Sequence, residues 1–90
     1  MEEHSTAFAA QGQTIAQAIA DGVITARIRA RLRLDPLTAD YEIHVETVRS
    51  VVHLSGFVES AQVRTQALRI ARDVAGVRRV SDFLDVRKLD

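Results

Sequence analysis

The chain has 90 residues, of which 47% are apolar and 27% are charged, and its formal net charge at pH 7 is zero. This length and composition fit one small globular domain with a compact, efficiently used core. The lack of cysteine excludes disulfides, thiolate metal sites and cysteine-linked lipids, and no run approaches the ~18 apolar residues of a membrane-spanning helix.

The chain begins with "MEEHSTAFAA", which has two glutamates and no lysine or arginine and therefore does not resemble a secretory signal peptide. We expect a cytoplasmic protein if the chain is complete, and a different compartment if a targeting segment has been removed. Phe8, Ile15 and Ile19 form a thin apolar stripe in an Ala- and Gln-rich stretch. A short helix and a disordered arm fit this stretch equally well. We therefore divide the chain into an N-terminal arm at residues 1–20 and a folded domain at residues 21–90.

The first predicted helix begins at Asp21, a suitable N-cap, and runs through "GVITARIRARLRL". Ile24, Ile28 and Leu32 recur every four residues and predict one buried stripe. Asp35-Pro36 ends the helix, because the residue before proline is pushed out of the α region.

Two alternating segments follow and predict an antiparallel hairpin around Arg49-Ser50. In "YEIHVETV", Ile43, Val45 and Thr47 point one way, and Glu42, His44, Glu46 and Val48 point the other. In "VVHLSGFV", one side carries Val52, Leu54, Gly56 and Val58, and the other carries Val51, His53, Ser55 and Phe57. We expect Gly56 on the buried side, where its missing side chain lets a helix backbone come close.

From Ser60, a plausible N-cap, the period becomes helical, with one face made of Val63, Ala67, Ile70, Ala71 and Val74. Leu68 lies off this stripe and is interpreted as a surface leucine. Gly76 is placed at the helix C-terminus. The last segment, "VRRVSDFLDV", alternates again, with Val80, Leu84 and Val86 set against Ser81, Phe83 and Asp85.

The predicted order is therefore αββαβ. A strand–helix–strand crossover in one sheet is right-handed and makes the two strands parallel. We predict an α+β fold, a single two-layer domain with a mixed three-stranded sheet and both helices packed on one face.

The ordered motifs of this chain resemble those of the BON domain family. They are the stripe Ile24, Ile28 and Leu32, then "DPL", "IHV", "VHLSGFV" and "ALRIARDVAGVRRV", and together they span about residues 21–87. The resemblance implies a non-enzymatic binding module without a cofactor that attaches to phospholipid surfaces, in support of cell-envelope integrity. It would place the protein in the periplasm or cell envelope. Similar small modules also assemble, so the alternative is a protein-interaction or self-assembly module.

The hairpin tip departs from the family, which often has Asn-Gly or Asp-Gly there. Neither Arg49 nor Ser50 favours the positive φ of a two-residue type I′ turn. A four-residue loop at Thr47–Ser50 is the alternative and would shift the pairing by one step.

The first helix carries four arginines and no acid between Asp21 and Asp35; they are the candidate lipid-binding residues Arg27, Arg29, Arg31 and Arg33. Arg27 and Arg31 flank one edge of the apolar stripe, and Arg29 and Arg33 flank the other. Such guanidiniums suit anionic head groups. The alternative is a core helix whose arginines extend into solvent and pair with Asp35 or Asp73.

The uncovered sheet face is the candidate interaction surface for a protein partner or a second copy, made of Val48, Val51, Phe57 and Phe83. The N-terminal arm, through Phe8, Ile15 and Ile19, could cover it instead.

His44, Glu46 and His53 share this face. They lack a fourth ligand and a second shell, so we predict cross-strand pairing and no metal site.

Catalytic motifs and a Gly-rich phosphate loop are absent from the sequence. The G-x-x-G clamp of KH-type RNA binders is missing too, so we expect neither an enzyme nor a nucleic-acid partner.

Overall fold

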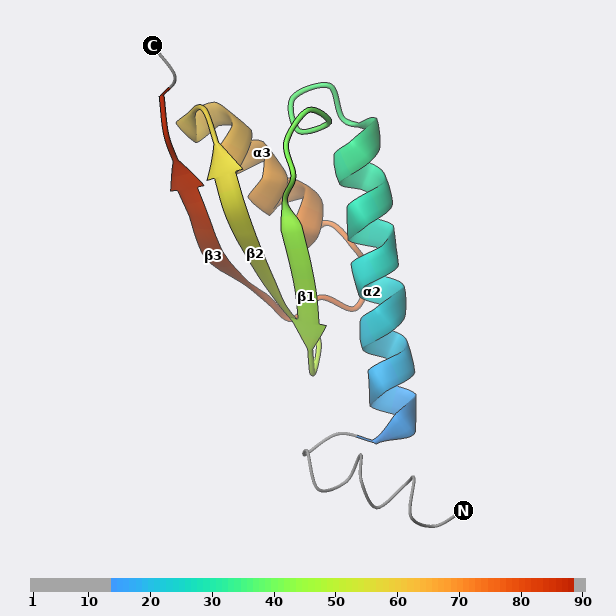
Figure 1. The fold of residues 1–90 in the computed structure, drawn as a ribbon. Coiled ribbons are helices and arrows are strands. Elements are labelled where there is room, and N and C mark those ends of the chain that lie inside the picture. The colour runs from blue at the N-terminus through green and yellow to red at the C-terminus, as the bar shows by residue number, and fades with distance from the viewer. Residues whose placement is uncertain (1–13, 89–90) are drawn as a thin grey trace.

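The computed structural model describes residues 14–88, which form two helices and one three-stranded sheet (Figure 1). With the labels of Figure 1, the elements are α2 (Ile15–Leu34), β1 (His44–Val48), β2 (Val51–Val58), α3 (Ala61–Arg72) and β3 (Arg79–Val86). The strand order is β1-β2-β3, with β1 antiparallel and β3 parallel to β2. Both helices pack against the same face of this sheet. The predicted two-layer αββαβ fold is confirmed.

The core lies between the helices and the covered face of the sheet. The α2 stripe, Ile24, Ile28 and Leu32, is buried as predicted. The sheet contributes Val45, Val52, Leu54 and Val58, and α3 contributes Val63, Ala67, Ile70 and Ala71. Leu68 is buried as well, so its assignment to the surface was wrong. Because α3 contacts β2, β3 and α2, its buried arc is wider than a single stripe.

The first helix begins earlier than predicted. Its N-cap is Thr14, whose hydroxyl accepts a hydrogen bond of 3.0 Å from the Gln17 amide, and Asp21 lies inside the helix. α2 therefore continues through the expected boundary between residues 20 and 21, although the division into arm and domain itself stays a prediction. The end was predicted correctly, because Asp35 is the C-cap.

The proposed covering of the open sheet face by the arm is wrong for two of its three residues. Ile15 and Ile19 belong to α2, which packs on the other face of the sheet. Phe8 lies outside the described residues.

The hairpin has the two-residue turn. Val48 pairs with Val51, and the intervening Arg49 and Ser50 have φ values of 53° and 66°. The buried Asp21 carboxylate stabilises this turn by accepting hydrogen bonds from the Arg49 amide at 2.8 Å and the Ser50 amide at 2.9 Å. The four-residue loop is thereby excluded.

Gly56 lets another stretch of backbone lie close to β2, but this stretch is not the helix backbone that we expected. A Cβ on Gly56 would lie 2.7 Å from the carbonyl oxygen of Glu42, just before β1, so the close neighbour is this segment and not a helix backbone. Gly76 has the expected positive φ of 93°, although α3 already ends at Arg72 and Gly76 lies in the following loop.

Candidate functional site

The four predicted arginines all lie on α2 with exposed side chains. Within residues 14–88, none of their guanidiniums forms an ion pair. Asp35, a proposed partner, instead accepts hydrogen bonds from the Leu37 amide and the Gln66 side chain. Four positive charges are therefore displayed along one helix without an acidic partner among the described residues.

The apolar stripe between these arginines is not available to a ligand, because its three residues are buried in the core. A different apolar surface lies on the opposite, solvent-facing side of α2. Its largest members are Ile15, Ile19, Val23 and Leu34, which are 45%, 64%, 45% and 83% exposed. We call this surface the outer strip; it consists of Ile15, Ile19, Val23, Ala26, Ala30 and Leu34.

The outer strip and the arginines form one surface. At 100° per residue the strip spans about a third of the helix circumference. Arg27 and Arg31 border it on one side, and Arg29 and Arg33 border it on the other. A helix that begins at Asp21 does not predict the strip, because Ile15 and Ile19 then lie outside the helix. A start at Thr14 would have shown that α2 is apolar on two opposite faces.

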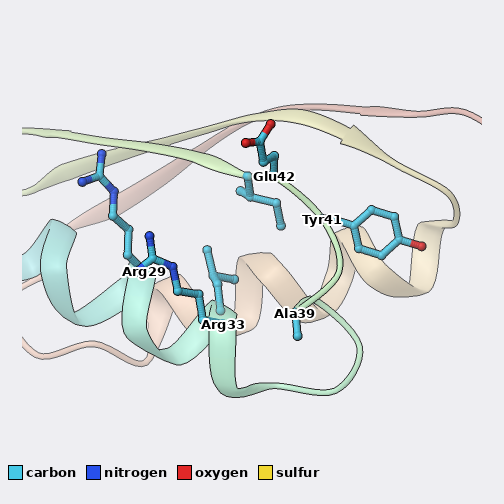
Figure 2. Close-up of a pocket in the computed structure, with 7 residues that line it drawn as sticks. Arg29, Arg33, Ala39, Tyr41 and Glu42 are labelled. Atoms are coloured by element: carbon cyan, nitrogen blue, oxygen red, sulfur yellow. The ribbon is translucent and has the colours of Figure 1, made fainter.

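A pocket of about 310 Å³ opens beside this surface, between the C-terminal half of α2 and the segment leading into β1. Figure 2 shows the Arg29 and Arg33 side chains extending from α2 toward the chain that carries Glu42. The remaining lining residues are Leu32, Ala39, Tyr41 and Ile43. The pocket therefore combines two guanidiniums with an apolar floor, and the Glu42 carboxylate points away from both arginines (Figure 2).

Tyr41 stays a neutral phenol in this pocket. Burial raises its pKa above the ordinary value, and the neighbouring charge of Glu59 and a hydrogen bond to that carboxylate raise it further. Its hydroxyl points away from the arginines in Figure 2. Only Arg29, Arg33 and Glu42 therefore carry charge among the lining residues.

The predicted interaction residues share the open sheet face, with Val48 and Val51 beside the hairpin turn and Phe57 near the other end of β2. Val48, Phe57 and Phe83 are 39%, 56% and 63% exposed, and Val51 is half-buried. The His53 ring stacks on Phe83 with 5.8 Å between ring centroids, and the Arg87 guanidinium lies 4.1 Å from the centre of the Phe57 ring. Each aromatic ring therefore contacts one polar neighbour, and each residue stays more than half exposed.

The histidines of this face do not form a cluster. Glu46 lies opposite His53, whereas His44 lies opposite Ser55. Among the described residues, no group of three His, Asp, Glu or Cys side chains is arranged to hold a metal ion. The neighbours of His53 are a carboxylate across the hairpin and an aromatic ring.

Two comparisons relate the chain to known proteins. The family model described as the BON domain matches residues 20–88. The osmotically-inducible protein Y of Escherichia coli (strain K12) is 43% identical over 67 residues, which are 74% of this chain and 33% of that protein. The chain thus spans about a third of the length of this relative. No helix in residues 14–88 combines the length and apolar character needed to cross a membrane.

Proposed function

The chain belongs to the BON domain family, and on this premise we propose that it is a non-enzymatic binding module that docks on anionic phospholipid surfaces through α2. The name of the relative describes induction by osmotic stress. We place the docking in that setting, where it would support the integrity of the cell envelope.

One observation carries this proposal: the outer strip is exposed and is bordered on both sides by arginines. Helices that lie in a membrane interface combine an apolar face with flanking basic residues. Each base near an anionic bilayer contributes about 1 kcal/mol, and each apolar side chain that leaves water adds to this. Because the core stripe faces the sheet, the outer strip can enter the interface without unfolding the domain.

Sedimentation with vesicles tests the proposal. The chain should sediment with vesicles that contain anionic lipid and stay in solution with purely zwitterionic vesicles. Added salt should weaken the binding steeply, because the Debye length falls to about 3 Å at 1 M. Equally weak binding to both kinds of vesicle would refute the docking.

A matched pair of variants assigns the binding to α2. The test variant replaces four arginines of α2 by glutamine: Arg27, Arg29, Arg31 and Arg33. The control replaces four exposed arginines elsewhere: Arg69, Arg72, Arg78 and Arg79. Both variants lose the same charge, so only the first should abolish binding; equal losses would indicate attraction by net charge alone.

The open sheet face supports a second candidate function, a protein-interaction or self-assembly module. Phe57 and Phe83 are large aromatic residues that remain more than half exposed. Exposed apolar patches on small domains commonly mark interaction surfaces. Light scattering over a range of protein concentrations tests self-assembly directly, and a monomer at every concentration would speak against it.

A further inference from the structure

The outer edge of β3 is the part of the sheet most open to another strand. β3 lies at one end of the strand order and is eight residues long, and within residues 14–88 no strand pairs with its outer side. It is the strand farthest from α2 (Figure 1). β1, at the other end of the sheet, has only five residues and contacts α2. A long unpaired edge is a template for a further strand, because its outward amide and carbonyl groups have no partner in the sheet.

The side chains of β3 that face the helices are incompletely covered. Val80, Leu84 and Val86 are in register with core-facing positions of β2, yet each stays half-buried. Val52 and Val58 of β2, the partners of two of them, are 0% and 1% exposed. The difference arises because β3 has a neighbouring strand on one side only. A further strand beside β3 would cover these half-exposed apolar side chains.

Alternate amides of β3 point to this free edge. The Arg87 amide donates a hydrogen bond of 2.7 Å to the Val58 carbonyl of β2. Consecutive amides of a strand point to opposite edges. The amides that point outward are therefore those of the even-numbered residues: Val80, Asp82, Leu84 and Val86.

Asp82 closes the middle of this edge. One of its carboxylate oxygens accepts a hydrogen bond of 2.9 Å from the outward Leu84 amide, and the other lies 2.9 Å from the Arg64 Nε of α3. A strand that paired here would have to displace the carboxylate from the amide and remove part of its charge from water. Charged side chains that point to the core side of an edge strand protect such edges against pairing.

The sequence of β3 fits a second copy of itself. In an antiparallel pair, residues whose amides point outward face each other, and a two-fold axis at Asp82 meets this condition. Arg79 then lies opposite Asp85 of the second copy, Val80 lies opposite its Leu84, and symmetry repeats both pairs. Opposite charges and apolar side chains stabilise a sheet in such cross-strand positions. Only Asp82 opposes the pairing, because it would face the same carboxylate of the second copy.

We infer that Asp82 is an autoinhibitory contact on a strand-binding site. The site is the outer edge of β3, and its occupant is β3 of a second copy, which would join two three-stranded sheets into one continuous sheet. The wild-type chain keeps this edge closed, so any self-association that it shows proceeds through the open sheet face. The inference is independent of lipid docking, because no residue of α2 takes part.

Replacing Asp82 in the full chain tests the inference. Asp82→Thr removes the carboxylate from the Leu84 amide and sets two threonines opposite each other, a favourable cross-strand pair. The matched control Asp82→Lys loses the same two contacts but keeps a charged side chain on the edge, which also disfavours pairing. In sedimentation equilibrium, Asp82→Thr should form a dimer at least about tenfold tighter than any self-association of the wild type. Asp82→Lys should behave like the wild type.

Two further measurements separate edge pairing from other causes of association. Circular dichroism and thermal unfolding check that both variants are folded, and Asp82→Ala takes the place of Asp82→Thr if that variant does not fold. Amide hydrogen exchange at Val80 and Leu84 should be slower in Asp82→Thr than in Asp82→Lys, because their outward amides become paired.

Three outcomes would overturn the inference. If Asp82→Thr associates no more than the wild type, then Asp82 does not close the edge. If both Asp82 variants associate equally, then lost stability is the cause. If Asp82→Thr associates without slower exchange at Val80 and Leu84, or forms species larger than a dimer, then the contact is not a two-fold pairing of β3.

Discussion

At the scale of single residues, Asp21 joins the first helix to the hairpin. Its carboxylate accepts hydrogen bonds from the Arg49 and Ser50 amides, and the Gln17 side chain donates a further one to it at 2.9 Å. These contacts hold two non-glycine residues at positive φ, a conformation that L-residues adopt only at some cost in energy. The Asp21 carboxylate thus stabilises a turn that lacks the Asn-Gly or Asp-Gly pair usually found in turns of this kind.

Asp21→Asn should lower the free energy of unfolding by about 1 to 3 kcal/mol, because an amide presents only one acceptor oxygen to the two turn amides. Urea denaturation measures the loss. The control is Asp85→Asn, which removes an exposed ion pair with Arg87 and should change stability by at most about 0.5 kcal/mol. Equal losses in the two variants would show that Asp21 does not anchor the turn.

Substitution by alanine should change the stability of the domain in opposite directions at two glycines. Gly56→Ala places a Cβ against the Glu42 carbonyl oxygen at a φ of 128°, so it should destabilise the domain by at least about 2 kcal/mol. Gly22→Ala meets nothing within 4 Å inside α2 and should stabilise it by about 0.5 to 1 kcal/mol. Thermal unfolding of both variants checks the signs, and a stable Gly56→Ala variant would rule out the close approach.

At the scale of elements, α2 differs from an ordinary surface helix because it carries apolar residues on two opposite sides. One side completes the core, and the other is the outer strip. Folding requires only the first. The second side is therefore free for a role in binding, which is the basis of the docking proposal.

Ile19→Ser tests this role of the outer strip. Ile19 is 64% exposed, and isoleucine and serine have similar helix propensities, so the substitution should change stability by less than about 0.5 kcal/mol. Binding to anionic vesicles should weaken about tenfold, because one apolar side chain no longer enters the interface. The control Val48→Ser, on the open sheet face, should bind like the wild type. Unchanged binding by Ile19→Ser would limit docking to the arginines.

The elements themselves could largely be predicted from the sequence. Apolar residues recur every four positions in α2, fall on one face in α3 and alternate in the strands, because each element buries a face against the same core. The start of α2 could not be predicted this way. Asp21 has the residue type of an N-cap, yet its oxygens bind amides 28 and 29 positions away in the sequence. Local patterns do not predict such a contact, which supports the two-residue turn.

The candidate site could be predicted only in part. The arginines were evident from their spacing and the lack of acids between them. The pocket was not, because the segment that carries Tyr41 and Glu42 comes alongside Arg29 and Arg33 only after the chain has turned back from α2 into β1. Sequence patterns identify the charged residues of a single element. They do not show the pocket, because it lies between two segments that are separate in the sequence.

At the scale of the whole molecule, the outer strip and the open sheet face lie on different sides of the domain. α2 covers one face of the sheet and turns the outer strip away from it, whereas Phe57 and Phe83 lie on the uncovered face. The thickness of both layers separates the two surfaces. A domain docked through α2 would therefore keep its open face accessible, and the two proposed functions are compatible in one molecule.

This arrangement predicts that the two surfaces act independently. Phe83→Asp should abolish concentration-dependent association in light scattering and leave vesicle binding unchanged. The variant without the four α2 arginines should lose vesicle binding and keep its concentration-dependent association. Because distant sites contribute additively, the combined variant should show the sum of the two effects on vesicle binding within about 0.5 kcal/mol. If Phe83→Asp weakens vesicle binding as much as loss of the arginines does, then the membrane contacts the sheet face and the assignment of docking to α2 is wrong.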